Sequence, residues 1–176
     1  MTMPFPRSRR SYDEASLYEY AVGALGRQMR SVADLKRLLR RRVDRQEDAG
    51  EMIESVIAKL KEQHYLDDRR YAAAYSSYRR DNEKFGRQRV ITDLKMKGVH
   101  GEVIDSAVGA AYEGVSEEKL ARAFLARKRL RKPANQKETA RIFRALMRAG
   151  FSSRVIFAIL KHWDVDEEFL ATLESE

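Results

Sequence analysis

The 176-residue chain has no cysteine, only three prolines and nine glycines, and a single tryptophan. Without cysteine it can form neither a disulfide nor a thiolate-ligated zinc site. No apolar run approaches the roughly 20 residues that span a bilayer, and the N-terminus lacks the apolar stretch of a signal peptide. We therefore expect a cytoplasmic protein that has no contact with a membrane.

The signature motifs of the common enzyme classes are absent as well. The sequence contains no Gly-x-x-x-x-Gly-Lys phosphate loop, no Gly-x-Ser-x-Gly elbow and no His-Glu-x-x-His pair. His64, His100 and His162 lie far apart, so we interpret them as helix-end residues and not as zinc ligands. We expect no enzymatic activity, no metal and no cofactor.

The residues that are abundant favour helices. Charged residues make up 35% of the chain and hydrophobic residues 43%, and no stretch of strand length alternates between the two. The charge is uneven, because residues 1–150 hold 33 basic and 21 acidic side chains, whereas residues 151–176 hold two and six. The net charge of +12 on residues 1–150 favours an acidic partner, and the acidic residues 151–176 are candidates for covering that positive charge within the chain.

A helical pattern in the middle of the chain recurs after 52 residues. Its apolar and glycine positions correspond without a gap: Leu94, Gly98, Val99, Val103, Ile104 and Val108 become Leu146, Gly150, Phe151, Val155, Ile156 and Leu160. An earlier, looser copy carries Leu35, Leu39, Ile53 and Ile57 at the matching positions. Tandem repetition of this kind predicts an all-α fold of three three-helix, helix-turn-helix-like repeats in an elongated, curved array.

The predicted organisation has five parts. They are a basic N-terminal tail (1–12), repeat 1 (13–66), repeat 2 (67–114), repeat 3 (115–164) and an acidic C-terminal tail (165–176).

Several residues predict where the helices begin and end. Ser31 is a candidate N-cap, and Gly98 and Gly150 are candidates for the left-handed residue that follows a helix. Asp67 and Asp68 could be paired catalytic acids, but adjacent helical residues point about 100° apart, so capping of a helix N-terminus explains them better.

Tyrosines at helical spacing predict one face of the first helix in repeat 2. Tyr71, Ala74, Tyr75 and Tyr78 share this face, which we interpret as core-facing. A base-stacking platform is the alternative, with Tyr78 expected to be the most exposed because it lies near the helix end.

These motifs together resemble one protein family. Residues 65–72 (Tyr-Leu-Asp-Asp-Arg-Arg-Tyr-Ala), followed by Gly86-Arg87 and by residues 94–99, are similar to the central repeat of the bacterial RecX regulatory proteins. Residues 31–39 resemble the Ser-x-x-Glu-Leu helix of that family, with Asp34 in the acidic place, and Asp93 stands where a Glu is usual.

The resemblance implies a non-enzymatic modulator of the RecA recombinase, and hence a role in recombination, DNA repair and the SOS response. Such a protein binds in the groove of the RecA filament on DNA and mainly inhibits ATP hydrolysis, strand exchange and coprotease action. We expect a monomer that binds bare DNA weakly, if at all. The alternative is a helical protein that acts directly on nucleic acid, because three-helix units with basic faces resemble DNA-binding helix-turn-helix modules.

Clusters of basic residues are the candidate partner-binding sites. The predicted contacts to RecA or DNA are Lys36, Arg37, Arg40, Arg41, Arg79, Arg80, Lys84, Arg87, Lys95, Lys97, Arg127, Lys128, Arg129, Arg131 and Lys132. A charged helix face is often merely solvated, and cations near a helix C-terminus complement its dipole. The excess of positive charge favours a partner contact for at least one cluster.

Overall fold

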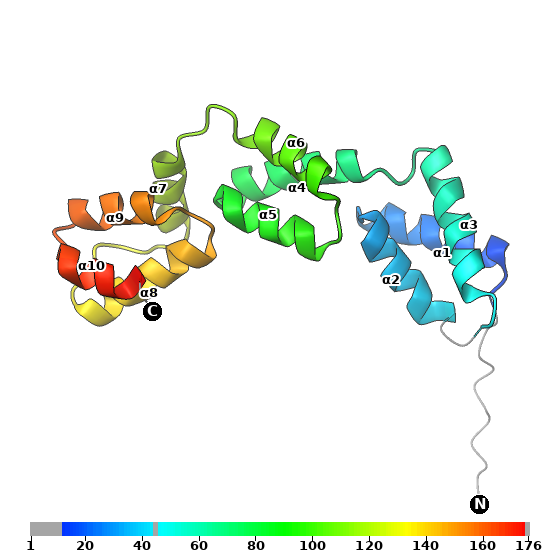
Figure 1. Ribbon diagram of the computed structural model, residues 1–176, viewed down its shortest axis with the longest axis horizontal. Coiled ribbons are helices and arrows are strands. Elements are labelled where there is room, and N and C mark those ends of the chain that lie inside the picture. The colour runs from blue at the N-terminus through cyan, green and yellow to red at the C-terminus, as the bar shows by residue number, and fades with distance from the viewer. Residues whose placement is uncertain (1–11, 44–45, 175–176) are drawn as a thin grey trace, which may run out of the picture. The chain divides into compact units, whose positions relative to one another are not determined.

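A computed structural model describes residues 12–43 and 46–174, which form ten α-helices and no strand (Figure 1). The predicted all-α class is therefore confirmed. The helices are α1 (Glu14–Arg27), α2 (Val32–Val43), α3 (Ala49–Glu62), α4 (Asp68–Asp81), α5 (Arg87–Met96), α6 (Gly101–Tyr112), α7 (Glu117–Arg127), α8 (Gln136–Arg148), α9 (Ser153–His162) and α10 (Glu167–Glu174). Within the described residues, no helix is long and apolar enough to cross a membrane.

The helices follow the repeat pattern of the sequence. Helices α1–α3 lie within residues 13–66, α4–α6 within 67–114 and α7–α9 within 115–164. The chain forms two compact units, one up to Tyr71 and one from Ala72 onward, which are described separately below. Of the predicted N-terminal tail, only Tyr12 is among the described residues.

Short polar side chains begin many of the helices. The Asp13 carboxylate accepts the Ser16 backbone N–H at 2.8 Å in a capping box, and Ser31 Oγ accepts the Asp34 N–H at 3.1 Å. In the second unit Ser116 and Asn135 cap α7 and α8 in the same way. Each cap satisfies an N–H group that has no partner within its helix. The predicted N-cap at Ser31 is confirmed.

Glycines in the left-handed conformation end α5 and α8, as predicted. Gly98 has φ +71° and Gly150 has φ +87°. The next N–H group reaches back five residues, from Val99 to Leu94 O at 3.1 Å and from Phe151 to Leu146 O at 3.3 Å. This Schellman arrangement buries Val99 and Phe151, which explains why a Gly-apolar pair recurs in the sequence.

The core of the first unit is aliphatic. It contains Leu17 of α1, Leu35 and Leu39 of α2, and Ile53 and Leu60 of α3, all at most 2% exposed. These residues lie at helical spacing, so each helix buries one stripe against the other two.

A partly buried hydrogen bond joins the end of this unit to α2. Asp68, the first residue of α4, accepts the Val32 N–H at 2.8 Å. Burial raises the pKa of the Asp68 carboxyl, although this hydrogen bond acts in the opposite direction.

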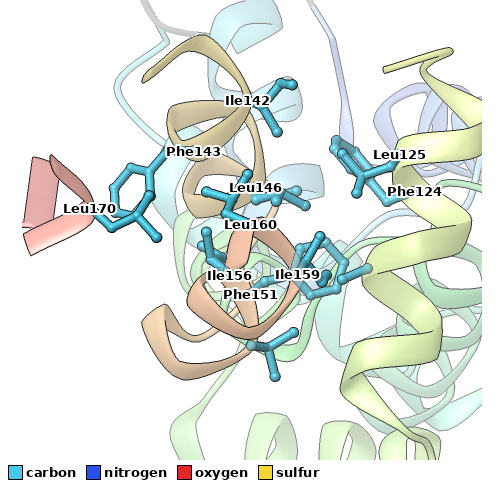
Figure 2. Close-up of a cluster of buried hydrophobic side chains, with 13 residues drawn as sticks. Phe124, Leu125, Ile142, Phe143, Leu146, Phe151, Ile156, Ile159, Leu160 and Leu170 are labelled. Atoms are coloured by element: carbon cyan, nitrogen blue, oxygen red, sulfur yellow. The ribbon is translucent and has the colours of Figure 1, made fainter. Parts of the chain in front are cut away.

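The main core of the second unit gathers around α8 and α9. Phe143 and Leu146 of α8 pack with Ile156 and Leu160 of α9, and Figure 2 shows Leu170 of α10 beside Phe143. Leu170 is only 1% exposed. The segment predicted as an acidic tail therefore contains a packed helix, because Leu170 and its neighbours supply an apolar side that the acidic composition concealed.

The buried side of α4 differs in part from the core-facing side that the sequence predicted. Tyr71 is buried, but Ala74 and Tyr78 are exposed, and the buried side runs instead through Ala72 and Ser76. The prediction that Tyr78 is the most exposed of the three tyrosines is confirmed, at 56% exposure.

Within the second unit, the start of α5 meets the end of α8. The Gly86 N–H donates to Ala149 O at 2.8 Å. A Cβ atom on Gly86 would lie 2.3 Å from Gly150 O, and one on Gly150 would lie 2.2 Å from the Arg89 nitrogen. Both glycines are needed because backbone occupies the space of a side chain.

Replacing Gly86 by Ala tests this close approach. Gly86 has φ −70°, which any residue adopts, so the substitution adds only the clash with the Gly150 backbone. We expect Gly86→Ala to lower the free energy of unfolding of the second unit by about 2–3 kcal/mol, the cost of overpacking a close contact. Urea unfolding followed by fluorescence of Trp163, the single tryptophan, measures the change.

Gly101→Ala is the matched control, because Gly101 also lies at a helix start but a Cβ there meets nothing within 4 Å. Its unfolding midpoint should equal that of the original protein or exceed it. Equal midpoints for the two variants would show that the approach of α5 to α8 is not tight in solution.

Candidate functional site

The predicted partner-binding cations fall into two groups. Some are held by side chains or carbonyls of the same unit, and the others extend from the surface. The held residues are Lys36, Arg37, Arg79, Arg80, Lys97, Arg127, Lys128 and Lys132.

In repeat 1, the two groups lie on the same helix. Lys36 Nζ lies 2.7 Å from the Glu54 carboxylate of α3, and Arg37 Nη2 lies 2.5 Å from Asp34 one turn earlier. Arg40 and Arg41 are exposed and make no ion pair with a described residue. The end of α2 therefore presents Arg40 and Arg41 to solvent.

In repeat 3, Arg127 contacts the loop between α4 and α5. Its Nε donates to Asn82 O at 2.7 Å, and its Nη2 lies 3.0 Å from the Glu83 carboxylate. Lys132 pairs with the exposed Asp164 at 2.7 Å. Arg127 and Lys132 therefore contribute to holding the second unit together.

The remaining predicted cations make no ion pair with any described residue. They are Arg40, Arg41, Lys84, Arg87, Lys95, Arg129 and Arg131, of which all but the half-buried Lys84 are exposed. Lys84 and Arg129 have φ +59° and +54°, so each follows its helix in the left-handed conformation. These cations are the ones best placed to contact a partner.

A buried carboxylate organises the charges between α4 and α5. Asp93 is 8% exposed. Its Oδ2 accepts the Tyr75 hydroxyl at 3.0 Å and Arg79 Nη2 at 2.9 Å, and its Oδ1 lies 2.9 Å from Arg89 Nε. Burial, and then the bond to Asp93, raises the pKa of the Tyr75 hydroxyl. One anion thus compensates two guanidinium groups in a partly desolvated site.

Aromatic rings complete this cluster. The Arg79 and Arg89 guanidinium carbons lie 4.8 and 5.6 Å from the centre of the Phe85 ring, and Lys97 Nζ lies 5.5 Å from the Tyr75 ring. Cations at these distances are attracted by the ring faces. Arg79 therefore has a structural role that its place in a basic sequence cluster did not reveal.

Arg80 helps to hold the end of α6. It donates to Ala111 O and pairs with Asp81, with 2.7 Å between Nε and Oδ1. The neighbouring Tyr112 hydroxyl donates to Phe85 O at 2.7 Å, and burial raises the pKa of Tyr112 to about 12. The Tyr112 contact fixes the loop that leads into Gly86, and the Arg80 contact joins α4 to α6.

The adjacent aspartates do not form an acid pair. Asp67 Oδ1 accepts the N–H groups of Arg69 and Arg70 at 2.8 and 3.2 Å, whereas Asp68 turns to Val32 of α2. The capping interpretation is confirmed, and Asp68 caps a different helix from the one it begins. Among the described residues, no group of three His, Cys, Asp or Glu side chains could hold a metal ion.

Sequence reasoning missed one set of exposed cations. Lys137, Arg141, Arg144 and Arg148 all lie on α8, outside the predicted basic clusters. Their spacing of four, three and four residues is the signal that could have revealed them.

Comparison with known proteins identifies the family. A family model described as the second three-helix domain of RecX matches residues 67–108. The regulatory protein RecX of Cronobacter sakazakii is 32% identical over 173 residues, which cover 93% of this chain and 100% of the relative. The chain belongs to the RecX family. The regulatory protein RecX of Myxococcus xanthus is 32% identical over 84% of this chain and 85% of its own length.

Other RecX proteins are longer, and solved structures share the fold. The chain spans 56% of the regulatory protein RecX of Bacillus licheniformis, with 29% identity over 152 residues. A crystal structure of regulatory protein RecX has a TM-score of 0.64 at 24% identity, covering 85% of this chain and 71% of that one. RecX from Lactobacillus salivarius has a TM-score of 0.61 at 22% identity, covering 86% and 96%.

Replacing Asp93 by Asn tests the buried charge cluster. The substitution keeps the size of the side chain but leaves Arg79 and Arg89 without an anion. Removing one partner of a fully buried pair costs about 3–5 kcal/mol, and the partial exposure of the two arginines reduces the expected loss to about 2–3 kcal/mol. Urea unfolding at neutral pH measures it.

Asp81→Asn is the control, because Asp81 also pairs with an arginine but its side chain is 57% exposed. We expect a loss of no more than about 1 kcal/mol for this surface pair. If Asp93→Asn lowered the free energy of unfolding by no more than Asp81→Asn does, Asp93 would not organise the cluster.

Proposed function

We propose that this chain binds the RecA filament on DNA, as a cytoplasmic monomer, and restrains its ATP hydrolysis, strand exchange and coprotease activities. The observation that carries the proposal is membership of the RecX family along nearly the whole chain. RecX proteins are named as regulatory proteins, and the family resemblance supplies RecA as the regulated partner.

In each unit taken by itself, exposed cations supply contacts of suitable charge. Arg40 and Arg41 on α2, Arg87 at the start of α5, and Arg129 and Arg131 after α7 extend from three successive repeats. A filament of protein on DNA carries a dense array of phosphates and carboxylates, so clusters of this sign accelerate and orient the encounter.

Inhibition of this kind needs no catalytic residue. A ligand shifts a conformational equilibrium by its difference in affinity between the two states. A chain that binds one filament state more tightly, or that occupies the space required by a second DNA, therefore slows the filament's reactions.

A titration of the chain into RecA on single-stranded DNA tests the proposal. We expect the rate of ATP hydrolysis to fall and then reach a plateau as the filament becomes saturated. Phosphate release measures the rate. An unchanged rate at saturating amounts of the chain would contradict the proposal.

Charge reversal tests whether the end of α2 takes part. We expect Arg40→Glu/Arg41→Glu to raise the concentration needed for half-inhibition by about tenfold or more, because both cations face solvent without an ion pair to a described residue. Lys61→Glu/Arg69→Glu changes the charge equally in the same unit, at exposed positions outside the predicted clusters. An equal rise in the half-inhibiting concentration for the two variants would show a general effect of net charge and no specific role for the end of α2.

Binding to bare DNA separates the proposal from direct action on nucleic acid. Under the proposal, the chain binds RecA-coated single strands more tightly than bare strands at physiological salt. A direct DNA-binding protein would bind the bare strand at least as tightly, with a steep loss of affinity as salt rises.

A further inference from the structure

The outer face of α8 carries a row of cations to which the proposed function assigns no role. The α8 basic row consists of Lys137, Arg141, Arg144 and Arg148, all exposed. At about 100° and 1.5 Å per residue, their side chains leave the helix within a sector of about 60° and extend along about 16 Å. The row is therefore straight and continuous.

The helix offers little negative charge to balance the row. The acidic residue of α8, Glu138, is half-buried, and its carboxylate accepts the Ala134 N–H at 2.8 Å at the helix start. Lys137, Arg141 and Arg148 make no ion pair with any described residue. These three cations of the row therefore face solvent without a carboxylate of the described residues in ion-pair contact.

The repeat itself shows that the fold does not require these cations. An offset of 52 residues places Arg89, Thr92 and Met96 of α5 where α8 has Arg141, Arg144 and Arg148. The inward residues correspond closely, since Leu94 and Leu146 are both fully buried. The same helix is therefore built with or without a basic outer face, so the row on α8 calls for a separate explanation.

The junction with α5 anchors one end of the row. The Gly86 N–H donates to Ala149 O at 2.8 Å, and Arg89 Nη1 donates to Arg148 O at 3.3 Å. Arg89 is itself held by Asp93 and so adds a fifth, fixed cation beside the last residue of the row. A cation line held by backbone contacts loses less freedom on binding than one on a loop.

The composition of the row favours phosphate over an acidic protein. Three of its four residues are arginines, whose planar guanidinium groups bind phosphate through two parallel hydrogen bonds. Protein interfaces usually centre on a buried aromatic or aliphatic anchor, and the row contains none. A nucleic-acid backbone, in contrast, presents evenly repeated negative charges along a line.

We propose that the α8 basic row, together with Arg89, binds the phosphate backbone of nucleic acid without reading its sequence. This site goes beyond the proposed function, because it places nucleic acid against α8 and holds whether or not the chain regulates RecA.

Direct binding of the full chain to labelled DNA tests this site without RecA. Fluorescence anisotropy with a fluorescein-labelled oligo(dT) strand and with a labelled duplex is measured over a series of sodium chloride concentrations. We expect Arg141→Gln/Arg144→Gln/Arg148→Gln to weaken binding about tenfold or more at the lowest salt. The slope of log affinity against log salt should fall by about 2–3, since each lost phosphate contact removes nearly one unit.

Two further variants control for net charge and for folding. Arg27→Gln/Lys61→Gln/Arg69→Gln removes the same charge from exposed positions on three different helices and should change the salt slope by less than about one. Arg144→Thr/Arg148→Met installs the residues that α5 carries at these positions, so it should keep the circular dichroism spectrum of the original protein and still lose affinity.

Three outcomes would overturn the proposal. The first is that the original chain binds neither DNA at the lowest salt. The second is that both triple variants weaken binding equally, which would indicate diffuse charge attraction. The third is that polyglutamate displaces the oligonucleotide at the same concentration as inorganic polyphosphate, which would show that the row has no preference for phosphate over carboxylate. Failure of the RecA titration leaves these outcomes unchanged, so the two proposals fail independently.

Discussion

Two stretches of backbone meet at Gly86 and Gly150 with no room for a side chain between them. At the contact the Gly86 N–H before α5 donates to Ala149 O at the end of α8, and the Arg89 side chain donates to Arg148 O. It also aligns the positive end of one helix dipole with the negative end of the other. Repeats 2 and 3 consequently share one compact unit, and the surfaces of α5 and α8 are presented together.

Asp93 divides the basic residues near this junction by role. Arg79 and Arg89 both depend on its carboxylate, and the Phe85 ring lies against both guanidinium groups. A high local density of arginine therefore does not by itself indicate a binding surface. Of the cations predicted from the sequence to contact RecA, those that remain available are the ones that make no ion pair with a described residue.

Features that depend on neighbouring residues could be predicted from the sequence. The helix ends at Gly98 and Gly150 and the cap at Ser31 follow from local patterns, and the repeat followed from a fixed offset. The role of Gly86 could not be predicted, because the atoms that exclude a side chain there belong to Gly150, 64 residues later. The candidate site was predicted only as a set of basic residues, since ion pairs such as Arg79–Asp93 and Arg127–Glu83 join residues far apart in the sequence. The α8 row was readable from its spacing, but interruption by apolar residues hid it from a search for basic clusters.

Helix α10 makes the acidic end of the chain part of the second unit. Leu170 inserts beside Phe143, while the exposed Glu168 carries charge on the outer side. Truncation after Trp163 would consequently remove a hydrophobic plug along with the negative charge, and any change in activity would mix unfolding with electrostatics. Substitutions that remove charge, such as Glu168→Gln, leave Leu170 packed in the core, which makes them the appropriate means of separating the two contributions.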